Sequence, residues 1–429
     1  MSEKHYDYLI VGNSTAAISA VEAIRRHDQA GSIAVVSGEP YPAYCAPLIS
    51  YVLAGKIPES RMNYRGADFY EKMRVTTHLG HEVTAVRPEE HQVVLDDGAA
   101  LGYGKLLLAC GGSPILPNLP GMDLGGVFTF TRYADVARVR SWVQDHGAQE
   151  AVVIGGGMIG VKAAEALEHL GLRTTVVELL DRILAQALDE RGSALAQTAL
   201  EKAGVRVLTS RGAAALEGAE GQVTAVRLDT GALLPAQVVI VAIGVRPNTP
   251  LAAEAGVAVN RGVLVDDHMR TSLPEVYAAG DVAEGYDMLL GESRPLAIWP
   301  NAYLQGGVAG TNMAGADQSF HGNVAMNSIQ VCGLPTISVG LTDPALAEEV
   351  LEYNSPDGQN YRRLFLRGNR IVGAVFVGEI DRAGIITGLI RERIDVSEFK
   401  QKLIGRELGL LSLPKEYRKH IVMGPGIEV

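Results

Sequence analysis

The sequence predicts an α/β protein with two similar strand–turn–helix–strand units and a smaller α+β region after them. The first unit covers residues 6–39 and the second covers residues 151–178, and in each an apolar strand runs into a turn of small residues. From about His321 the pattern changes to the alternation that is typical of β-hairpins. Because strands and helices alternate in both units, we expect each unit to form a parallel sheet covered by helices.

The first unit has the layout of a Rossmann-like dinucleotide fold. Its opening strand reaches Gly12, and Glu39 follows the next apolar strand. Small residues let a backbone approach a pyrophosphate at a helix N-terminus, and a carboxylate accepts a hydrogen bond from a ribose hydroxyl. Ser14 and Ala17 stand where glycines are usual. This segment alone is therefore compatible with a dinucleotide site or with a plain β–α–β core unit.

The second unit matches the same layout more fully. Its strand ends at Gly155, and Gly157 and Gly160 complete the glycine pattern before an apolar helix. Glu178 ends the next strand, eighteen residues after Gly160. The arrangement predicts NAD(H) binding, with a structural β–α–β turn as the alternative. The Glu178 carboxylate accepts from ribose hydroxyls and repels a 2′-phosphate, so NADH is preferred over NADPH, and the nearby Arg182 weakens that preference.

Composition and charge narrow the class of protein. The chain has 429 residues, 47% of them hydrophobic, which is enough for two or three domains. Its net charge of −11 argues against nucleic-acid binding. Cys45, Cys110 and Cys332 share no close spacing, so they predict neither an iron–sulfur cluster nor another metal site, and they suit a reducing cytosol. Without a leader or an apolar run of ~18 residues, we expect a cytoplasmic protein and no membrane insertion.

The C-terminal region differs from the rest in pattern and in charge. Alternation predicts hairpins at 327–339 and 361–376, and helical patterns cover 381–390 and 396–404. Residues 361–420 contain 13 Lys and Arg against seven Asp and Glu. This basic region could dock an acidic partner, because opposite charges steer association. A solvated surface and a homodimer interface are the alternatives.

Two nucleotide units in one chain, with the second nested inside the first, resemble the FAD- and NAD-dependent pyridine nucleotide–disulfide oxidoreductase superfamily. The resemblance covers nearly the whole chain and rests on segments 12–39, 155–178, 244–248 and 277–281. The last segment, Tyr277-Ala-Ala-Gly-Asp281, looks like the family's second FAD motif, in which the aspartate binds the ribityl chain. The resemblance therefore implies FAD on the first unit and NAD on the second.

The resemblance also implies domain limits and site residues. The FAD domain is expected at 1–115 and 245–320, the NAD domain at 116–244, and an interface-type domain at 321–429. Cys110 stands where the family often has Thr, and we interpret it mainly as a small core residue on the strand beside the cofactor. Ala302 lies in a helix start that faces the flavin in the family, where the helix dipole favours the reduced anion by about 0.3–1 kcal/mol. An ordinary helix start is the alternative. The implied FAD contacts are Gly12, Ser14, Ala17, Glu39, Val83, Cys110, Asp281 and Ala302, and the implied NAD contacts are Gly155, Gly157, Ile159, Gly160, Glu178 and Gly244.

Cysteine spacing separates branches within this superfamily. The CxxxxC of the disulfide reductases is absent from the sequence. A branch of NADH oxidases, peroxidases and coenzyme A disulfide reductases keeps one redox cysteine in this loop, which suggests Cys45 as a catalytic residue. That branch places its cysteine nearer the following Gly-Lys than Cys45 is. Loop 43–56 looks closer to the flavin subunits of assimilatory nitrite reductases and of ferredoxin- or rubredoxin-linked NADH oxidoreductases.

One pair of residues departs from the family pattern. Members commonly place a Lys near the flavin N5, paired with a Glu on the NAD helix. Here Tyr51 stands near the expected lysine, and Lys162 stands where the Glu is usual. We interpret Lys162 as a candidate catalytic residue that brings positive charge to the nicotinamide–flavin contact. A lysine on the helix surface is the alternative.

The resemblance implies an electron-transfer enzyme. A hydride would pass between NAD and FAD, and single electrons between FAD and an iron–sulfur protein, because a flavin exchanges one electron or two. The partner is a ferredoxin-like carrier or a subunit of a larger complex, as with carbon monoxide dehydrogenase or 2-oxoacid oxidoreductases. The alternatives are a stand-alone oxidase or thiol reductase that uses Cys45, and a non-catalytic subunit.

Overall fold

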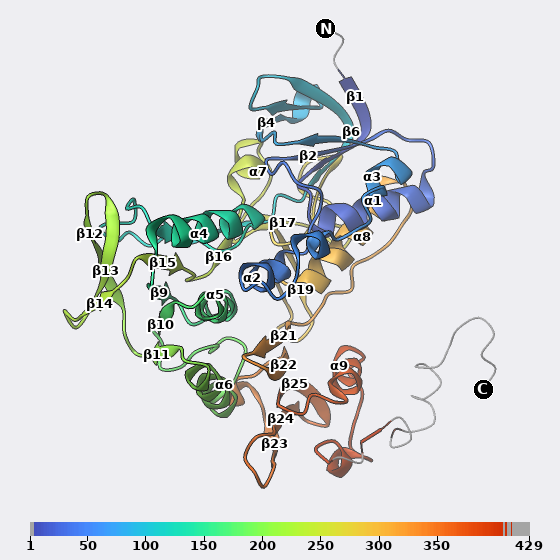
Figure 1. Cartoon of the computed structure of the whole chain (residues 1–429). Coiled ribbons are helices and arrows are strands. Elements are labelled where there is room, and N and C mark those ends of the chain that lie inside the picture. Colours follow the sequence, from blue (N-terminus) through green and yellow to red (C-terminus); the bar gives the residue numbers. More distant parts are fainter. Residues whose placement is uncertain (1–3, 406–407, 410–412, 414–429) are drawn as a thin grey trace. The chain divides into compact units, whose positions relative to one another are not determined.

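The computed structural model describes residues 4–405, 408, 409 and 413 (Figure 1). The chain divides into two compact units. The first unit contains residues 1–118, 126–148 and 240–323, and the second contains residues 119–125, 149–239 and 324–429. Each unit holds one of the two predicted nucleotide motifs. The three-domain limits expected from the sequence stay a prediction.

The first unit is built on a sheet in the order β3-β2-β1-β6-β5-β4, with β18 also paired to β6. Its parallel strands have both faces covered, so each reads as an almost continuous apolar run. Leu9 and Ile10 of β1, for example, are fully buried on opposite faces. The strands are β1 (Lys4–Val11), β2 (Ile33–Ser37), β3 (Val75–Leu79), β4 (Val83–Arg87), β5 (Gln92–Leu95), β6 (Ala100–Leu108) and β18 (Val276–Ala278).

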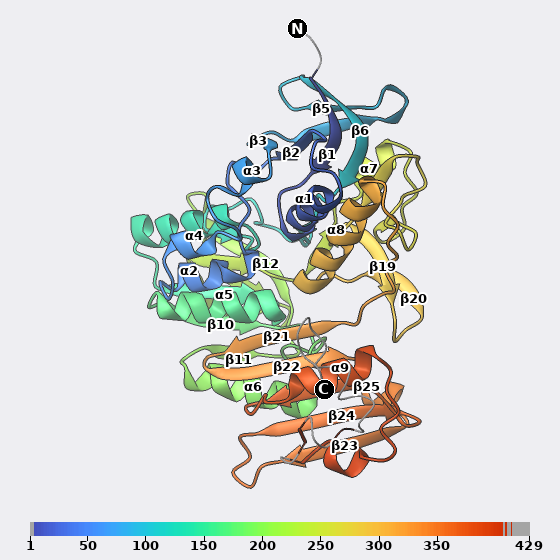
Figure 2. The same ribbon diagram turned by 90° about the vertical axis from the view of Figure 1, so that its right-hand side faces the viewer.

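Two helices, α1 (Thr15–His27) and α8 (Trp299–Met313), lie side by side on this sheet (Figures 1 and 2). Glycines allow their close contact. A Cβ on Gly306 would meet the carbonyl oxygen of Ala16 at 2.1 Å, and one on Gly310 would meet that of Ala20 at 2.4 Å. The contact joins residues nearly 300 positions apart and places the start of α8 beside the Gly12 turn.

The rest of the first unit consists of one further long helix, α4, and several short elements. α2 (Ile49–Leu53) contacts α4 (Tyr133–His146), and β7 (Gly112–Pro114) pairs with β16 (Val245–Pro247). A small sheet follows the order β17-β19-β20. Its strands are β17 (Val263–Leu264), β19 (Ala283–Asp287) and β20 (Glu292–Pro295).

The second unit begins with a parallel group in which β10 lies between β9 and β11. The helices α5 (Met158–His169) and α6 (Glu190–Lys202) contact this group. A three-stranded antiparallel sheet, β12-β13-β14, follows. The strands are β9 (Glu150–Ile154), β10 (Arg173–Val177), β11 (Arg206–Leu208), β12 (Ala213–Ala219), β13 (Gln222–Leu228) and β14 (Leu233–Pro235), and β15 (Val238–Val241) leads out of the second unit.

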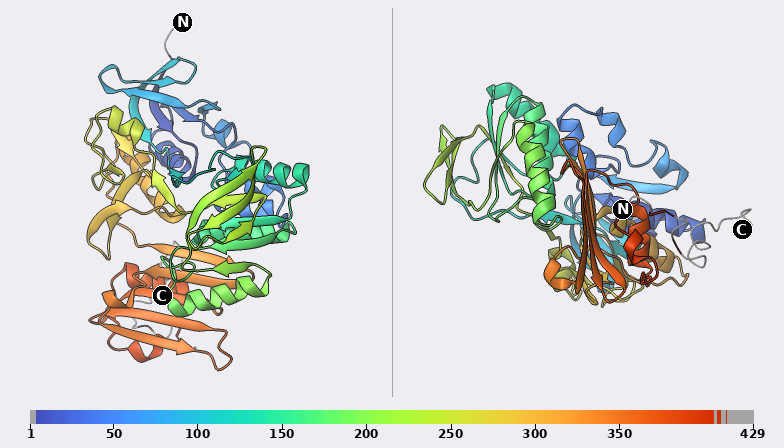
Figure 3. Two further views of the ribbon diagram at one scale, coloured as in Figure 1. Left: turned by 90° about the vertical axis from the view of Figure 1, so that its left-hand side faces the viewer. Right: turned by 90° about the horizontal axis from the view of Figure 1, so that it is seen from below.

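The C-terminal part of the second unit is a five-stranded antiparallel sheet in the order β21-β22-β25-β24-β23 (Figure 2). α6 and α9 (Ala383–Arg391) cover its opposite faces (Figure 3). The two predicted hairpins are confirmed as β21–β22 and β24–β25. The strands are β21 (Met326–Val331), β22 (Leu334–Gly340), β23 (Glu349–Asn354), β24 (Tyr361–Arg367) and β25 (Arg370–Val377).

The helix predicted at 396–404 is wrong. Only the 3-10 turn Lys400–Lys402 forms there within the described residues. The backbone N–H of Val396 donates to Asn369 O, and Arg370 bridges to Asp395. These contacts hold the chain against the β24–β25 turn, so tertiary pairing overrides a weak helical pattern. The predicted α/β class, with two nucleotide-type units and a smaller C-terminal α+β part, is confirmed.

Candidate functional site

The turn after β1 is shaped for close approach of a ligand to the backbone. Gly12 has φ +118°, and a Cβ there would lie 2.1 Å from Ala109 O, so only glycine fits. Ser14 is the N-cap residue of α1 but makes no capping hydrogen bond through its side chain within the described chain. Ala17 is fully buried under the first turn. The first N–H groups of α1 are therefore open to an anion, as a pyrophosphate site requires.

Glu39, just beyond the end of β2, is fixed by a residue that the sequence reading did not identify. The Tyr44 hydroxyl donates to Glu39 Oε2 at 2.7 Å and accepts from the Tyr133 N–H at 3.1 Å. Burial, with the neighbouring Glu39 charge, raises the pKa of Tyr44. The Glu39 side chain is 26% exposed, so it can still accept from a ribose hydroxyl. The proline-containing loop that follows Glu39 is evident in the sequence, but the hydrogen bond from Tyr44 to Glu39 could not be predicted from it.

Asp281 follows β18, whose end lies beside the ends of β1 and β6. Burial raises the pKa of its carboxyl to about 6. Among the described residues, no hydrogen bond to this carboxyl is found. A desolvated acceptor without a protein donor fits a hydroxyl-rich ligand such as the ribityl chain of FAD. Ala302 lies in the first turn of α8, and Gln305 of the same helix accepts from the N–H of Gly280 at 2.8 Å.

Cys110, Gly244 and Val83, which were also predicted as cofactor contacts, lie in the first unit. The Cys110 thiol donates to Asn248 O at 3.4 Å, and Asn248 Nδ2 donates back to Cys110 O at 2.7 Å. Burial raises the pKa of Cys110 to about 11, so it is a protonated thiol. Gly244 has φ +124° and precedes β16, whereas Val83 opens β4 and pairs with Leu95. Their roles as cofactor contacts stay predictions.

The Gly155 turn of the second unit fits the predicted NAD site. A Cβ on Gly160 would lie 1.9 Å from Gly155 O, and Gly157 is the N-cap residue of α5, with Ile159 in its first turn. The carboxylate of Glu178 is held beside the turn. Its Oε2 accepts from Gly156 N–H at 2.5 Å, and its Oε1 accepts from Leu180 N–H at 2.8 Å. The sequence motif therefore brings the glycines and the acid together.

Lys162 lies on α5 but is not a solvated surface lysine. Its side chain is 15% exposed, and its ammonium lies 2.6 Å from Glu165 Oε2. It also donates to Gln330 O of β21 at 3.1 Å. Glu165, one helical turn after Lys162, was not predicted as its partner, although the i,i+3 spacing on a helix favours such an ion pair. Tyr51, which stands near the position of the lysine expected from the family, lies on α2 of the first unit. The catalytic role of Lys162 stays a prediction.

Cys45 precedes a short 3-10 helix, Ala46–Leu48, and its backbone N–H donates to Met62 O. Burial raises the pKa of this thiol above its ordinary value. Since the thiolate is the nucleophile, the environment does not activate Cys45.

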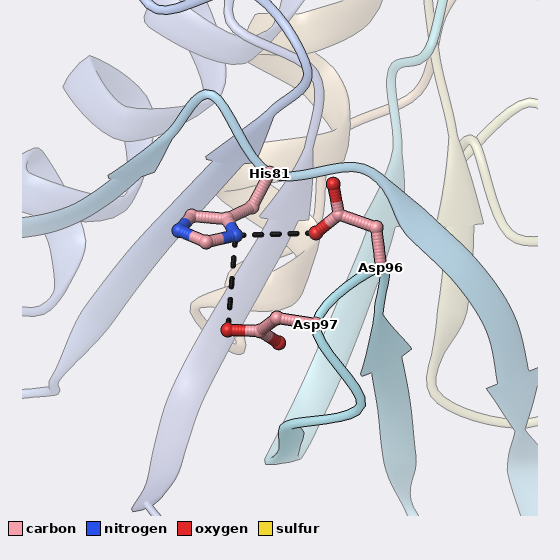
Figure 4. A group of neighbouring side chains, drawn as sticks. All are labelled: His81, Asp96 and Asp97. Atoms are coloured by element: carbon pink, nitrogen blue, oxygen red, sulfur yellow. Dashed lines mark hydrogen bonds and ion pairs between the residues drawn. The ribbon is translucent and has the colours of Figure 1, made fainter.

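Two groups of metal-ligand type occur in the described chain, and both are mainly exposed. In one, Nδ1 of His81 lies 3.1 Å from Asp96 Oδ1 and 3.9 Å from Asp97 Oδ2 (Figure 4). The hydrogen bond from His81 lowers the pKa of Asp96. The other group is Asp266, Asp267 and His268. Surface ion pairs of this kind are common without a metal, and we assign no ion to either group.

Comparison with known proteins decides the family. Residues 6–306 match the model for pyridine nucleotide-disulphide oxidoreductases, and residues 326–394 match that for the rubredoxin NAD+ reductase C-terminal domain. The chain belongs to the pyridine nucleotide-disulphide oxidoreductase family. It is an oxidoreductase of this family, and the FAD and NAD(H) cofactors predicted for it are confirmed. No helix in the described part of this family member has the length and apolar character needed to cross a membrane.

Several family members are similar over most of the chain. The NADH-dependent phenylglyoxylate dehydrogenase subunit epsilon of Aromatoleum evansii is 31% identical, over 95% of this chain and 96% of its own. The biphenyl dioxygenase system ferredoxin–NAD(+) reductase component of Paraburkholderia xenovorans is 32% identical, over 93% and 96%. The nitrite reductase [NAD(P)H] of Bacillus subtilis is 31% identical over 91% of this chain, which spans 48% of that protein.

Solved structures agree with this placement. The putidaredoxin reductase in a covalent complex with putidaredoxin has a TM-score of 0.83 and 26% identity, over 91% of this chain and 94% of its own.

Proposed function

We propose that this family member transfers electrons between NAD(H) and an iron–sulfur protein through bound FAD. The observation that supports the proposal is the presence of two nucleotide-type motifs in a chain whose C-terminal sheet matches the rubredoxin NAD+ reductase type. The similarity to a ferredoxin–NAD(+) reductase component and to a phenylglyoxylate dehydrogenase subunit supports a carrier protein or a larger complex as partner.

The residues of the first unit are suited to hold and orient FAD. The Gly12 turn offers backbone N–H groups to the pyrophosphate, Glu39 accepts from the adenosine ribose, and Asp281 accepts from the ribityl chain. The N-terminus of α8 would supply partial positive charge to the ring of a bound flavin. When bound, FAD supplies the conversion between hydride transfer and single-electron transfer.

The residues of the second unit are suited to hold NAD(H). The N-terminus of α5 would bind the pyrophosphate, and the Glu178 carboxylate would accept from the hydroxyls of the adenosine ribose. Arg182, which was expected to weaken the preference for NADH, is held by Asp181 at 2.9 Å. We therefore expect NADH to be used in preference to NADPH.

Charge on the described C-terminal surface contributes little to partner docking. Arg363 is paired with Asp189, Lys400 is paired with Glu349, and Arg362 is 3% exposed. The exposed charged groups nearly balance. They are the basic residues Arg370, Arg382, Arg391, Arg393 and Lys402 and the acidic residues Asp381, Glu392, Asp395 and Glu398. Arg367 donates to Leu346 O at 2.7 Å. The remaining basic residues of the region, Arg406, Lys415, Arg418 and Lys419, lie outside the described residues, and a homodimer stays an alternative use of this sheet.

The test is reduction of an iron–sulfur acceptor by the FAD-loaded protein. We expect NADH to bleach the flavin absorbance and a ferredoxin or rubredoxin to reoxidise it, much faster than oxygen, peroxide or coenzyme A disulfide does. An isolated enzyme that consumed NADH equally well with peroxide or disulfide, and lost this activity in Cys45→Ser, would instead support a stand-alone oxidase or thiol reductase. Co-purification with a cluster-containing subunit would identify the complex.

A further inference from the structure

A pocket of ≈ 390 Å³ lies in the first unit and contains none of the predicted FAD contacts. It is formed by the loop after β17, the β19–β20 hairpin and the segment after α8. Its apolar wall is Val265, Met269 and Phe320. Its polar lining is Asp266, Asp267, Glu284, Tyr286, Ser293 and His321. A volume of this size is at the lower end of the range for small-molecule sites, about 300–1,000 Å³.

Glu284 is the feature that points to a ligand. It lines the pocket, yet the residue is only 2% exposed. Its Oε1 accepts from the N–H of Gly262 at 2.7 Å. Across the described residues, no second hydrogen bond and no ion pair reaches this carboxylate. Buried carboxylates are normally paired with a cation, so the second oxygen of Glu284 is an acceptor that a ligand in the pocket can use.

The cations around the pocket are engaged with other acids. His268 lies between Asp267, at 2.6 Å, and Asp317, at 2.8 Å. Arg294 is paired with the buried Asp287 at 2.7 Å, and Arg261 lies 3.6 Å from Glu292.

Asp266, at the rim, forms no ion pair among the described residues, although the His268 ring lies within 4.8 Å of its carboxylate. Its Oδ1 accepts only from the backbone N–H groups of His268 and Arg270. Among the side chains that line the pocket, His321 is the basic one. Glu284 therefore presents to the pocket a buried carboxylate with no ion pair among the described residues, and the exposed Asp266 adds negative charge at the rim beside His268.

We propose that this pocket binds a small organic cation, an ammonium group on an apolar body. The ammonium would lie between Glu284 and Asp266, and the body would cover Met269 and Phe320. The ring of Tyr286 can add a cation–π contact. A hydrated divalent ion fits less well, because such ions require six or more oxygen ligands and one wall here is apolar.

Benzylamine is the probe, and benzyl alcohol is its neutral counterpart. Each is titrated into the FAD-loaded protein by calorimetry at constant ionic strength. We expect saturable binding of benzylamine and, because a buried charge pair is lost, binding of benzyl alcohol that is at least about tenfold weaker. Glu284→Gln keeps the acceptor for Gly262 and should weaken benzylamine binding by about tenfold or more, with FAD content and NADH oxidation unchanged.

Two further variants keep the test decisive. Asp266→Asn at the rim should weaken benzylamine binding severalfold even if Glu284→Gln does not fold. Asp317→Asn removes an acid that contacts His268 but does not line the pocket. This substitution should leave benzylamine binding unchanged. Equal binding of the amine and the alcohol, unaltered binding in Glu284→Gln and Asp266→Asn, or binding of calcium chloride in place of benzylamine would overturn the proposal.

Discussion

Asp281 allows a test in which the pKa of one desolvated carboxyl group is linked to stability and to the predicted FAD binding. Its pKa of about 6 lies above that of an unfolded aspartate, so folding favours the protonated form. The stability that it contributes is complete below about pH 4 and is lost as the pH rises through about 6. FAD-free Asp281→Asn should therefore be more stable than the FAD-free wild type above pH 6, by at most about 3 kcal/mol, and the difference should shrink as the pH falls.

Urea unfolding of the two FAD-free proteins at pH 5 and pH 8 measures this difference. Asp281→Asn should also retain less FAD, since a neutral amide is a weaker acceptor for ribityl hydroxyls than a carboxylate. The exposed Asp317→Asn is the control; it loses only a surface ion pair with His268 and should alter stability by at most about 1 kcal/mol at either pH. A variant that is less stable than wild type at pH 8 would contradict the assignment.

Cys45 gives a second prediction at the scale of one residue. Burial keeps its sulfur protonated at neutral pH, so it is not poised as a nucleophile. Cys45→Ser should keep NADH-dependent reduction of an iron–sulfur acceptor within about twofold of wild type, because no thiolate is needed. Initial rates with saturating NADH test this, with Cys332→Ser as a matched control. A loss of more than tenfold in Cys45→Ser alone would restore the redox role that the loop suggests.

At the scale of elements, Lys162 and Glu165 join α5 to β21. The pair is largely buried, with side-chain exposures of 15% and 5%, and Glu165 also accepts from Cys332 N–H at 3.4 Å. Lys162→Ala should reduce the free energy of unfolding by about 1–3 kcal/mol, because it breaks a mostly buried pair. A double-mutant cycle with Glu165→Gln gives the coupling energy, and an additive result would show that the pair is not coupled.

The same variant tests the kinetic role of Lys162. Stopped-flow reduction of the flavin by NADH reports the hydride step without an acceptor. A catalytic lysine predicts a slower limiting rate in Lys162→Ala at an unchanged NADH affinity. A change in stability alone, with the limiting rate unaltered, would leave Lys162 as a residue that positions α5 against β21.

Asp189 is a second link between elements of the second unit. One oxygen caps α6 by accepting from Gly192 N–H at 2.9 Å, and the other accepts from the Tyr361 hydroxyl and from Arg363 at 2.9 Å. Asp189→Ala removes a helix cap and a buried ion pair together, so unfolding should become easier by about 2–4 kcal/mol.

Chemical denaturation measures the effect of Asp189→Ala against a matched exposed pair. Glu217→Ala breaks the ion pair with Arg227, in which both side chains are nearly half exposed. It should change stability by at most about 0.5 kcal/mol. Equal effects of the two substitutions would show that Asp189 does not hold the C-terminal sheet to α6.

Local sequence patterns predicted the groups of residues that lie close together in the chain, but they did not predict contacts between distant segments. The Gly155 turn and Glu178 lie within one β–α–β unit, so spacing alone brought them together. Asp189 and Tyr361 are 172 residues apart, and no local rule pairs them. The contact of Tyr44 with Glu39 depends on how a loop folds back. The helix expected at 396–404 does not form for a related reason, because its backbone is hydrogen-bonded to the turn between β24 and β25.

At the scale of the whole molecule, each compact unit contains one nucleotide motif. The predicted FAD contacts Gly12, Glu39 and Asp281 belong to the first unit, and the Gly155 turn and Glu178, predicted to bind NAD, belong to the second. A ligand stabilises the part of the protein whose folded form it binds. Removal of FAD should therefore lower protection mainly in the first unit, and addition of NADH should raise it mainly in the second.

Hydrogen exchange of the FAD-loaded and FAD-free proteins tests this division. Amides of β1, α1 and the start of α8 should exchange at least about tenfold faster without FAD, because local opening there loses its ligand. Amides of β9, β10 and the five-stranded sheet should change little, and those of the Gly155 turn should slow when NADH is added. Asp281→Asn provides a matched sample with weakened FAD binding and an unaltered second unit. A uniform change across both units would show that they open as a single cooperative structure.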